Sequence, residues 1–224
     1  ISDLKSYNKK DSRLAKGRDF FNQSKFELQR IDTTLSNPKF IEHQVWNPQG
    51  PEDEPRSEEE EESLIKWRKT SYSFKYYKID KELWDSSSKL ESLERAERLY
   101  AIFFNKFHFV IGHYFRHIYH ILLFIERAEN EKIEKAKLIE NVTERNIEIE
   151  KAKADFKQYA EFIQAQMSIP ELFLLFYNSL SFPKLQRLLI KYNTLENLTI
   201  EDLLSEEHNI IEGVNLKSRK DLLR

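Results

Sequence analysis

The longest apolar run of the chain lies between Leu99 and Arg127. It reads LYAIFFNKFHFVIGHYFRHIYHILLFIER and contains no proline. As a single helix it would be roughly 45 Å long, at 1.5 Å per residue. A helix that is apolar around most of its circumference is either buried at the centre of a domain or embedded in a membrane. We therefore predict that this run belongs to a long central helix, which begins near Lys89 and continues past Arg127.

The polar residues of this run share one side of the predicted helix. At 100° per residue they form a single stripe, which also contains Ile102, Phe109 and Phe124. The polar members of the stripe are Lys106, His113, Arg116, His117, His120 and Arg127. Charged side chains near the middle of a bilayer cost a few kcal/mol each. For this reason we predict that the run is the core helix of a soluble domain and does not span a membrane.

Two further patterns precede the central helix. Apolar residues recur at helical spacing over residues 20–35, and Asn37-Pro38 ends that helix because the residue before a proline is pushed out of the α region. Residues 64–88 interleave aromatic residues with lysines. This pattern is typical either of an amphipathic segment that packs on the central helix or of a surface that stacks nucleic-acid bases. Ser86–Ser88 are the predicted cap of the central helix.

Residues 37–63 are predicted to form a flexible acidic loop between those two segments. They contain several prolines and a block of five glutamates. Like charges at this density repel one another and stay solvated. Ser57 is the predicted N-cap of the helix that follows.

The chain after Arg127 predicts a charged arm and then a compact end. Residues 128–167 are rich in Glu and Lys with a thin apolar stripe, which predicts two helices that meet near residues 140–143, with Thr143 as N-cap. Ser168 and Glu171 flank Pro170 in a capping-box pattern and predict a helix start. Shorter helices are predicted after Ser181 and Thr199.

Composition favours an all-α fold, a helical bundle around one long central helix with an extended charged arm. The chain has only four glycines and six prolines, whereas 13% of its residues are aromatic and 33% are charged. The length of 224 residues predicts a single helical domain over residues 1–224. A net charge of −2 provides no global attraction for nucleic acid. The chain has no cysteine and no glycine-rich phosphate loop, so we predict no disulfide and no cofactor.

Three blocks of the sequence resemble the family of phage abortive infection proteins. They are KGRDFF at residues 16–21, HYFRHIYHILLFI at residues 113–125, and FIQAQMSIPELFLLFYNSLS with LLIKYNTLENL at residues 162–198. Members of the family are bacterial, and many carry two transmembrane helices ahead of the Gly-Arg block. The resemblance implies an anti-phage defence protein whose cytoplasmic domain this chain represents. It also implies attachment to the cytoplasmic face of the inner membrane through a segment upstream of Ile1.

This chain departs from the family pattern in two places. Residues 164–167 read QAQM where an Arg-Ala-Gln-Leu run is usual, so any role of that arginine does not carry over. The charged stretch at residues 128–157 is also longer than expected. The family brings no defined chemistry, so the resemblance implies a role and leaves the mechanism to be argued from the residues.

Two kinds of chemistry fit the polar stripe. The pairs His113/His117 and His117/His120 have a spacing that suits a divalent metal, but there is no His-Glu-x-x-His motif, so we predict no metal site. A metal-independent ribonuclease of the HEPN type is the alternative function. In it His120 would act as acid or base, Arg116 would hold the phosphate and His113 or His117 would assist. The Arg116-x-x-x-His120 spacing is one residue short of that motif.

Two interpretations without catalysis remain. The stripe residues could form a buried network that pairs with Glu171, Tyr177 or Asn178 and fixes the helix register, which is the interpretation we favour for the stripe. They could instead form a surface that recognises a phage protein or a nucleic-acid end, with His117, Lys106 and Arg127 as binding residues. For the chain as a whole, the predicted partners are a phage or host protein as trigger and a second copy of the chain in a homo-oligomer. The predicted function is that of a defence sensor or effector acting through protein or membrane-proximal contacts.

Overall fold

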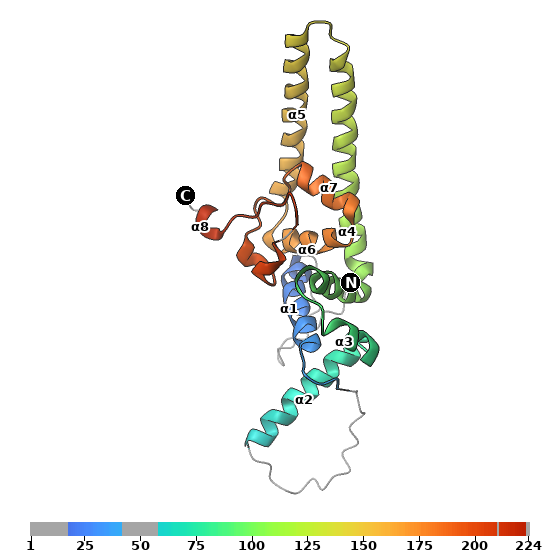
Figure 1. Ribbon diagram of the computed structural model, residues 1–224, viewed down its shortest axis with the longest axis vertical. Helices are drawn as coiled ribbons and strands as arrows, with labels where there is room; N and C mark the ends of the chain where they lie inside the picture. The colour runs from blue at the N-terminus through green and yellow to red at the C-terminus, as the bar shows by residue number, and fades with distance from the viewer. Residues whose placement is uncertain (1–17, 42–57, 210, 223–224) are drawn as a thin grey trace. The chain divides into compact units, whose positions relative to one another are not determined.

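The computed structural model describes residues 18–41, 58–209 and 211–222 (Figure 1). These residues are mainly helical and form no β-strand, which confirms the all-α prediction. Their helices are α1 (Arg18–Leu35), α2 (Glu58–Tyr77), α3 (Lys81–Ser87), α4 (Ser92–Lys137), α5 (Val142–Ala165), α6 (Ile169–Leu180), α7 (Pro183–Lys191) and α8 (Arg219–Leu222), with two 3-10 turns, η1 (Ile200–Asp202) and η2 (Glu206–His208), between α7 and α8.

Helix α4 is the predicted central helix, and it runs for 46 residues. Its predicted start, with Ser86–Ser88 as the cap, is wrong. Ser86 and Ser87 belong to α3, where both hydroxyls donate to the carbonyl oxygen of Leu83. A serine hydroxyl bonded to the preceding turn of its own helix is not available to cap the next one. None of the helices in the described ranges has the length and apolar content that crossing a bilayer requires.

The chain packs as two compact units. Of the described residues, unit 1 comprises residues 18–25, 107–209 and 211–222, and unit 2 comprises residues 26–41 and 58–106. The boundary falls within α1 and within α4, so both helices contribute residues to each unit. The stripe residues from Phe109 onwards belong to unit 1, whereas Ile102 and Lys106 belong to unit 2.

In unit 1, α5 returns antiparallel to the second half of α4, and the two form a long hairpin (Figure 1). Lys132 Nζ on α4 bonds to Asp155 Oδ2 on α5 at 2.7 Å. The N-cap of α5 is Asn141, two residues before the predicted Thr143. Asn141 Oδ1 accepts from the backbone N–H groups of Thr143 and Glu144, which satisfies two of the free donors at the helix start. The predicted charged arm is confirmed, with this corrected cap.

Helix α6 is buried along most of its length, from Glu171 to Leu180. Its predicted capping box is confirmed, because Glu171 Oε2 accepts from the backbone N–H and the hydroxyl of Ser168 at 2.7 and 2.6 Å. The other oxygen of Glu171 accepts from Tyr114 Oη on α4 at 3.1 Å. The same carboxylate therefore caps α6 and ties it to α4.

Helix α7 is held to α4 by a cluster of charged and polar side chains. Arg187 Nη1 and Nη2 donate to the two carboxylate oxygens of Glu126 at 2.5 and 2.7 Å. Lys191 Nζ lies 2.8 Å from Glu129 Oε2, which also accepts from Tyr192 Oη at 2.6 Å. We call these five residues the α4–α7 clamp. The hydrogen bonds from Arg187 lower the pKa of Glu126 to about 2, because they stabilise the charged carboxylate.

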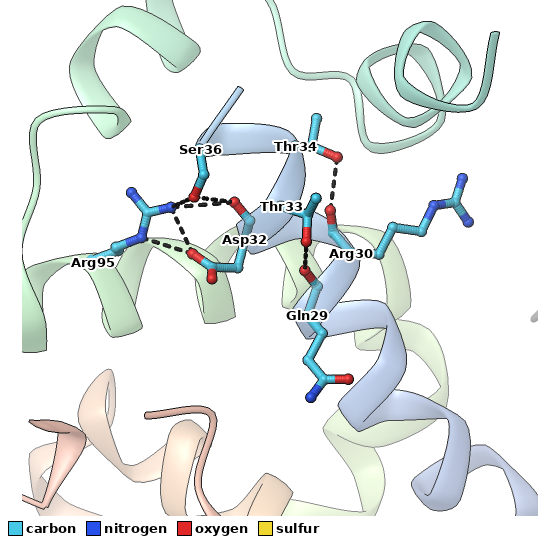
Figure 2. A network of polar contacts seen from close by, with 7 residues as sticks. All are labelled: Gln29, Arg30, Asp32, Thr33, Thr34, Ser36 and Arg95. Carbon is cyan, nitrogen blue, oxygen red and sulfur yellow. Dashed lines mark hydrogen bonds and ion pairs between the residues drawn. The ribbon is translucent and has the colours of Figure 1, made fainter. Parts of the chain in front are cut away.

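In unit 2, Arg95 of α4 binds the C-terminal end of α1 (Figure 2). Its Nε donates to Asp32 Oδ1 at 2.7 Å, and its Nη2 donates to Ser36 Oγ at 2.7 Å and to the Asp32 carbonyl oxygen at 3.2 Å. Helix α1 has no basic residue in its last turn, although a helix C-terminus carries a partial negative charge. Arg95 supplies that positive charge from a neighbouring helix.

The aromatic residues of α2 and its flank divide between the core of unit 2 and the surface. Phe74 and Tyr77 are buried, whereas Tyr72 is exposed. Tyr77 Oη donates to the buried carboxylate of Glu27. This burial supports the amphipathic interpretation of the segment rather than the nucleic-acid interpretation.

The predicted acidic loop lies mostly outside the described residues, as does Ser57, its predicted N-cap. Helix α2 begins at Glu58, so the last part of the predicted loop, up to residue 63, is helical. Glutamates in the first turn of a helix are stabilised by the partial positive charge of the helix N-terminus, which explains why this acidic segment joins the helix.

We predict that Arg95→Met destabilises the protein by about 1–3 kcal/mol, because it removes charge-assisted hydrogen bonds while keeping the apolar part of the side chain. Urea denaturation followed by circular dichroism measures the effect. The matched control is Arg98→Met, since Arg98 makes no hydrogen bond or ion pair with another described residue. Equal losses in both variants would contradict a capping role for Arg95.

We predict that Glu126→Gln lowers the free energy of unfolding near pH 7 by about 1–2 kcal/mol. The pKa of Glu126 is about 2 in the folded state, below its ordinary value of 4.5. Its contribution is therefore complete above pH 4.5 and is lost as the pH falls towards 2. Denaturation curves at several pH values should show the two proteins converging over that window. Glu131→Gln, which removes an exposed carboxylate, serves as control; a constant difference at all pH values would contradict the assignment.

Candidate functional site

The stripe on α4 forms an exposed surface of unit 1. Phe124 is 71% exposed and Phe109 is 56% exposed, which is unusual for phenylalanine. We call this surface the α4 open face and define it by eight residues that are all exposed: Phe109, His113, Arg116, His117, His120, Ile121, Phe124 and Arg127. It is the largest group of predicted site residues that the structure brings together.

The interpretation of the stripe as a buried network is wrong. His113, Arg116, His117 and His120 are exposed, and none of them makes a hydrogen bond or ion pair with another described residue. The partners expected for them are occupied elsewhere. Glu171 binds Ser168 and Tyr114, and Tyr177 Oη lies 2.8 Å from His208 Nδ1.

The physical reason for this error lies in the helix periodicity. The buried side of α4 in unit 1 is supplied by an apolar series, Phe107, Ile111, Phe115, Ile118, Leu122 and Ile125. That series fills the side opposite the stripe, so the stripe faces solvent. Phe109 and Phe124 made the stripe look partly apolar in sequence, and only the structure shows that they are outside the core.

Two predicted stripe members are not part of the α4 open face. Ile102 is buried in unit 2. Lys106, a predicted binding residue, is half-buried in unit 2, and its Nζ lies 4.1 Å from the centroid of the Tyr76 ring. An ammonium over an aromatic face is a favourable cation–π contact, so Lys106 already has a structural role.

The α4 open face is positively charged and lacks acidic groups. The chain has no Asp or Glu between Arg98 and Ile125, although a third of its residues are charged. Arg116 and Arg127 carry the permanent positive charges of the face, and three histidines lie between or beside them. Such a surface attracts carboxylates or phosphates and has no complementary charge of its own.

Helix α5 adds exposed aromatic residues beside this face. Tyr159 is 54% exposed and Phe162 is 61% exposed. Both follow Asp155 at helical spacing on one line of α5, and Asp155 pairs with Lys132 of α4. Lys132 in turn lies on the same line of α4 as Ile121, three turns away, so the α5 aromatics extend the apolar edge of the open face that Ile121 begins.

The exposed side chains of the α4 open face are accessible to a partner molecule, and the positions of Arg116 and His120 also suit chemistry on a phosphate. Arg116 and His120 are one helical turn apart, so both side chains can reach a single anion. Within the described residues, no group of three or more histidines and carboxylates is arranged to hold a metal ion. The catalytic assignment of Arg116, His120 and His113 stays a prediction, as do binding roles for His117 and Arg127.

Sequence reasoning missed the α4–α7 clamp. A signal for part of it was present, because Glu126 and Glu129 follow Leu122 at spacings of four and seven residues and therefore lie on the buried line of α4. A carboxylate at a buried position needs partners. The identity of those partners, Arg187, Lys191 and Tyr192, required the structure.

Comparisons with known proteins bear on unit 1. No curated protein and no solved structure matches this chain. Attachment to a membrane through an upstream segment stays a prediction. Residues 106–203, which carry the α4 open face, α5, α6 and α7, match the family model described as putative phage abortive infection protein, so the resemblance is confirmed over this region and indicates a part in abortive infection defence.

Proposed function

We propose that this protein acts in phage abortive infection as a sensor or effector that works by macromolecular contact, and that the α4 open face is its contact surface. The observation that carries the proposal is the exposure of Phe124, at 71%, within a face whose arginines and histidines make no hydrogen bond or ion pair with another described residue. A fold does not require a phenylalanine at such a position, whereas a binding surface does.

The composition of the face supports a protein partner. Cores of protein interfaces are enriched in aromatic residues and arginine and depleted in lysine, aspartate and glutamate. The α4 open face has two phenylalanines and two arginines and none of the three depleted types. Nucleic-acid surfaces usually contain more permanent positive charges than the two found here.

A ribonuclease remains the second candidate, and one observation favours it. Arg116 and His120 are exposed, unpaired among the described residues and separated by one helical turn. A histidine that moves a proton and an arginine that holds a phosphate need this accessibility. The candidate requires that His120 itself take part in the reaction, which contact alone does not.

We predict that Phe124→Asp reduces protection against phage by roughly tenfold or more, because a charge replaces the most exposed apolar side chain of the open face. The measurement is the efficiency of plating on cells that produce the protein at equal levels. Phe182→Asp is the matched control, since Phe182 is also an exposed phenylalanine and lies outside the open face. Full protection by Phe124→Asp would contradict the contact surface.

We predict that His120→Gln keeps protection within about threefold of the wild type, because glutamine preserves size and hydrogen bonding but cannot act as an acid or base at neutral pH. Plating efficiency is again the measurement, together with the integrity of total RNA in infected cells. Loss of protection by His120→Gln, with RNA that is cleaved only by the wild type, would establish the ribonuclease instead.

A further inference from the structure

We infer that the α4 open face binds a second copy of this chain, with the two α4 helices antiparallel and related by a two-fold axis that passes between Arg116 and His117. The inference rests on the proposed function only in taking this face as the contact surface. The inference goes beyond the proposed function because it names the partner, a second copy of the chain, and the register of the two α4 helices.

Six of the eight residues of the face have the same spacing in both directions, whereas Ile121 and Arg127 have no counterpart in it. From one end the order is Phe109, His113, Arg116, and from the other end it is Phe124, His120, His117. The steps are four and three residues on each side, and the centre falls between residues 116 and 117. All six side chains are exposed. Only the central pair breaks the symmetry of residue types, with arginine on one side and histidine on the other.

In a two-fold interface, this symmetric spacing places residues of the same type beside one another. In a two-fold dimer the same patch meets itself, so a residue i that contacts residue j is matched by j contacting i. In an antiparallel pair, residues at equal distances from the centre lie at the same level. Phe109 then lies beside Phe124 of the second copy, and His113 lies beside His120 of the second copy. Aromatic rings therefore meet aromatic rings at every level except the central one.

The charges favour the antiparallel arrangement over a parallel one. A parallel pair would place each residue beside its own copy and would bring together both Arg116 with Arg116 and Arg127 with Arg127. In the antiparallel pair the two copies of Arg127 are about 30 Å apart along the axis, at 1.5 Å per residue. Of the arginines of the face, only the two Arg116 side chains then lie close to each other; Arg127 lies at the level of Lys106 of the second copy, whose own ammonium lies over the Tyr76 ring.

The available area is sufficient for a specific dimer. A large exposed side chain contributes about 80–100 Å², so eight of them offer about 700 Å² per copy. Standard interfaces bury about 800 Å² per partner. The exposed Tyr159 and Phe162 on α5 border the same face and supply further area.

The meeting of two Arg116 side chains gives this dimer a distinctive salt dependence. Like charges at the two-fold axis repel, and salt or a bound anion reduces that repulsion. The dimer should therefore become stronger with inorganic phosphate or with ionic strength. A complex with an acidic protein partner would become weaker under the same conditions.

The first experiment is sedimentation velocity of the full chain over about 1–100 µM, with and without inorganic phosphate. We expect a monomer–dimer equilibrium that phosphate strengthens, and we expect Phe124→Asp to raise the dissociation constant by about tenfold or more. Phe182→Asp should leave it unchanged. A monomer at every concentration, a dimer unaffected by Phe124→Asp, or a dimer that salt dissociates would overturn the inference.

A second experiment tests the register and uses the absence of cysteine from the chain. His113→Cys and His120→Cys, one of them tagged, are mixed and oxidised. We expect a disulfide between the two different variants and little within either variant alone, because each position is about 10 Å from its own copy along the axis. Disulfides formed equally well by each variant alone would indicate parallel pairing and overturn the register.

These tests separate the inference from the proposed function. A monomeric wild type that loses protection on Phe124→Asp would overturn the second copy as partner and keep the contact surface. A dimer that Phe124→Asp dissociates without loss of protection would support the second copy and contradict the proposed function.

Discussion

The burial of one side of α4 is the constraint on which unit 1 depends. Its apolar series from Phe107 to Ile125 forms the core side of this part of a 46-residue helix, and the amphipathic pattern leaves the opposite side polar. The bond between Tyr114 and Glu171 holds α6 to α4, and the α4–α7 clamp holds α7 to it. With these partners occupying one side, the stripe has to face solvent or a second molecule.

Buried carboxylates in both units are satisfied by tyrosine hydroxyls. Tyr77 donates to Glu27 in unit 2, and Tyr114 and Tyr192 donate to Glu171 and Glu129 in unit 1. Burial, followed by the adjacent carboxylate, raises the pKa of each of these tyrosines, so each stays a neutral donor. A phenol supplies the hydrogen bond that the carboxylate needs and is itself uncharged.

The sequence was most informative where the cause is local. The all-α class, the length of α4, the end of α1 before Pro38 and the capping box at Ser168 follow from periodicity, proline sterics and side-chain reach. The cap predicted at Ser86–Ser88 failed because Ser86 and Ser87 belong to the preceding helix and bond to its carbonyl groups, and the cap predicted at Thr143 failed because Asn141 takes the same role two residues earlier. The sequence of α4 alone does not show whether the stripe is buried or exposed. It depends on which side α6 and α7 cover, and their positions are set by contacts more than fifty residues away in the sequence, such as Tyr114 with Glu171.

The α4 open face is not explained by the stability of the fold. Its aromatic residues gain nothing from exposure to water, and its arginines and histidines form no internal pairs among the described residues. An interface accounts for both facts, since the rings become buried and the charged groups become paired only when a partner binds.

With a second copy as that partner, the two Arg116 side chains meet at the axis and His120 of each copy lies about one turn away. An anion that relieves the arginine repulsion would then sit beside a histidine. The dimer is therefore compatible with both the contact and the ribonuclease proposals, which differ in whether His120 only packs there or also moves a proton.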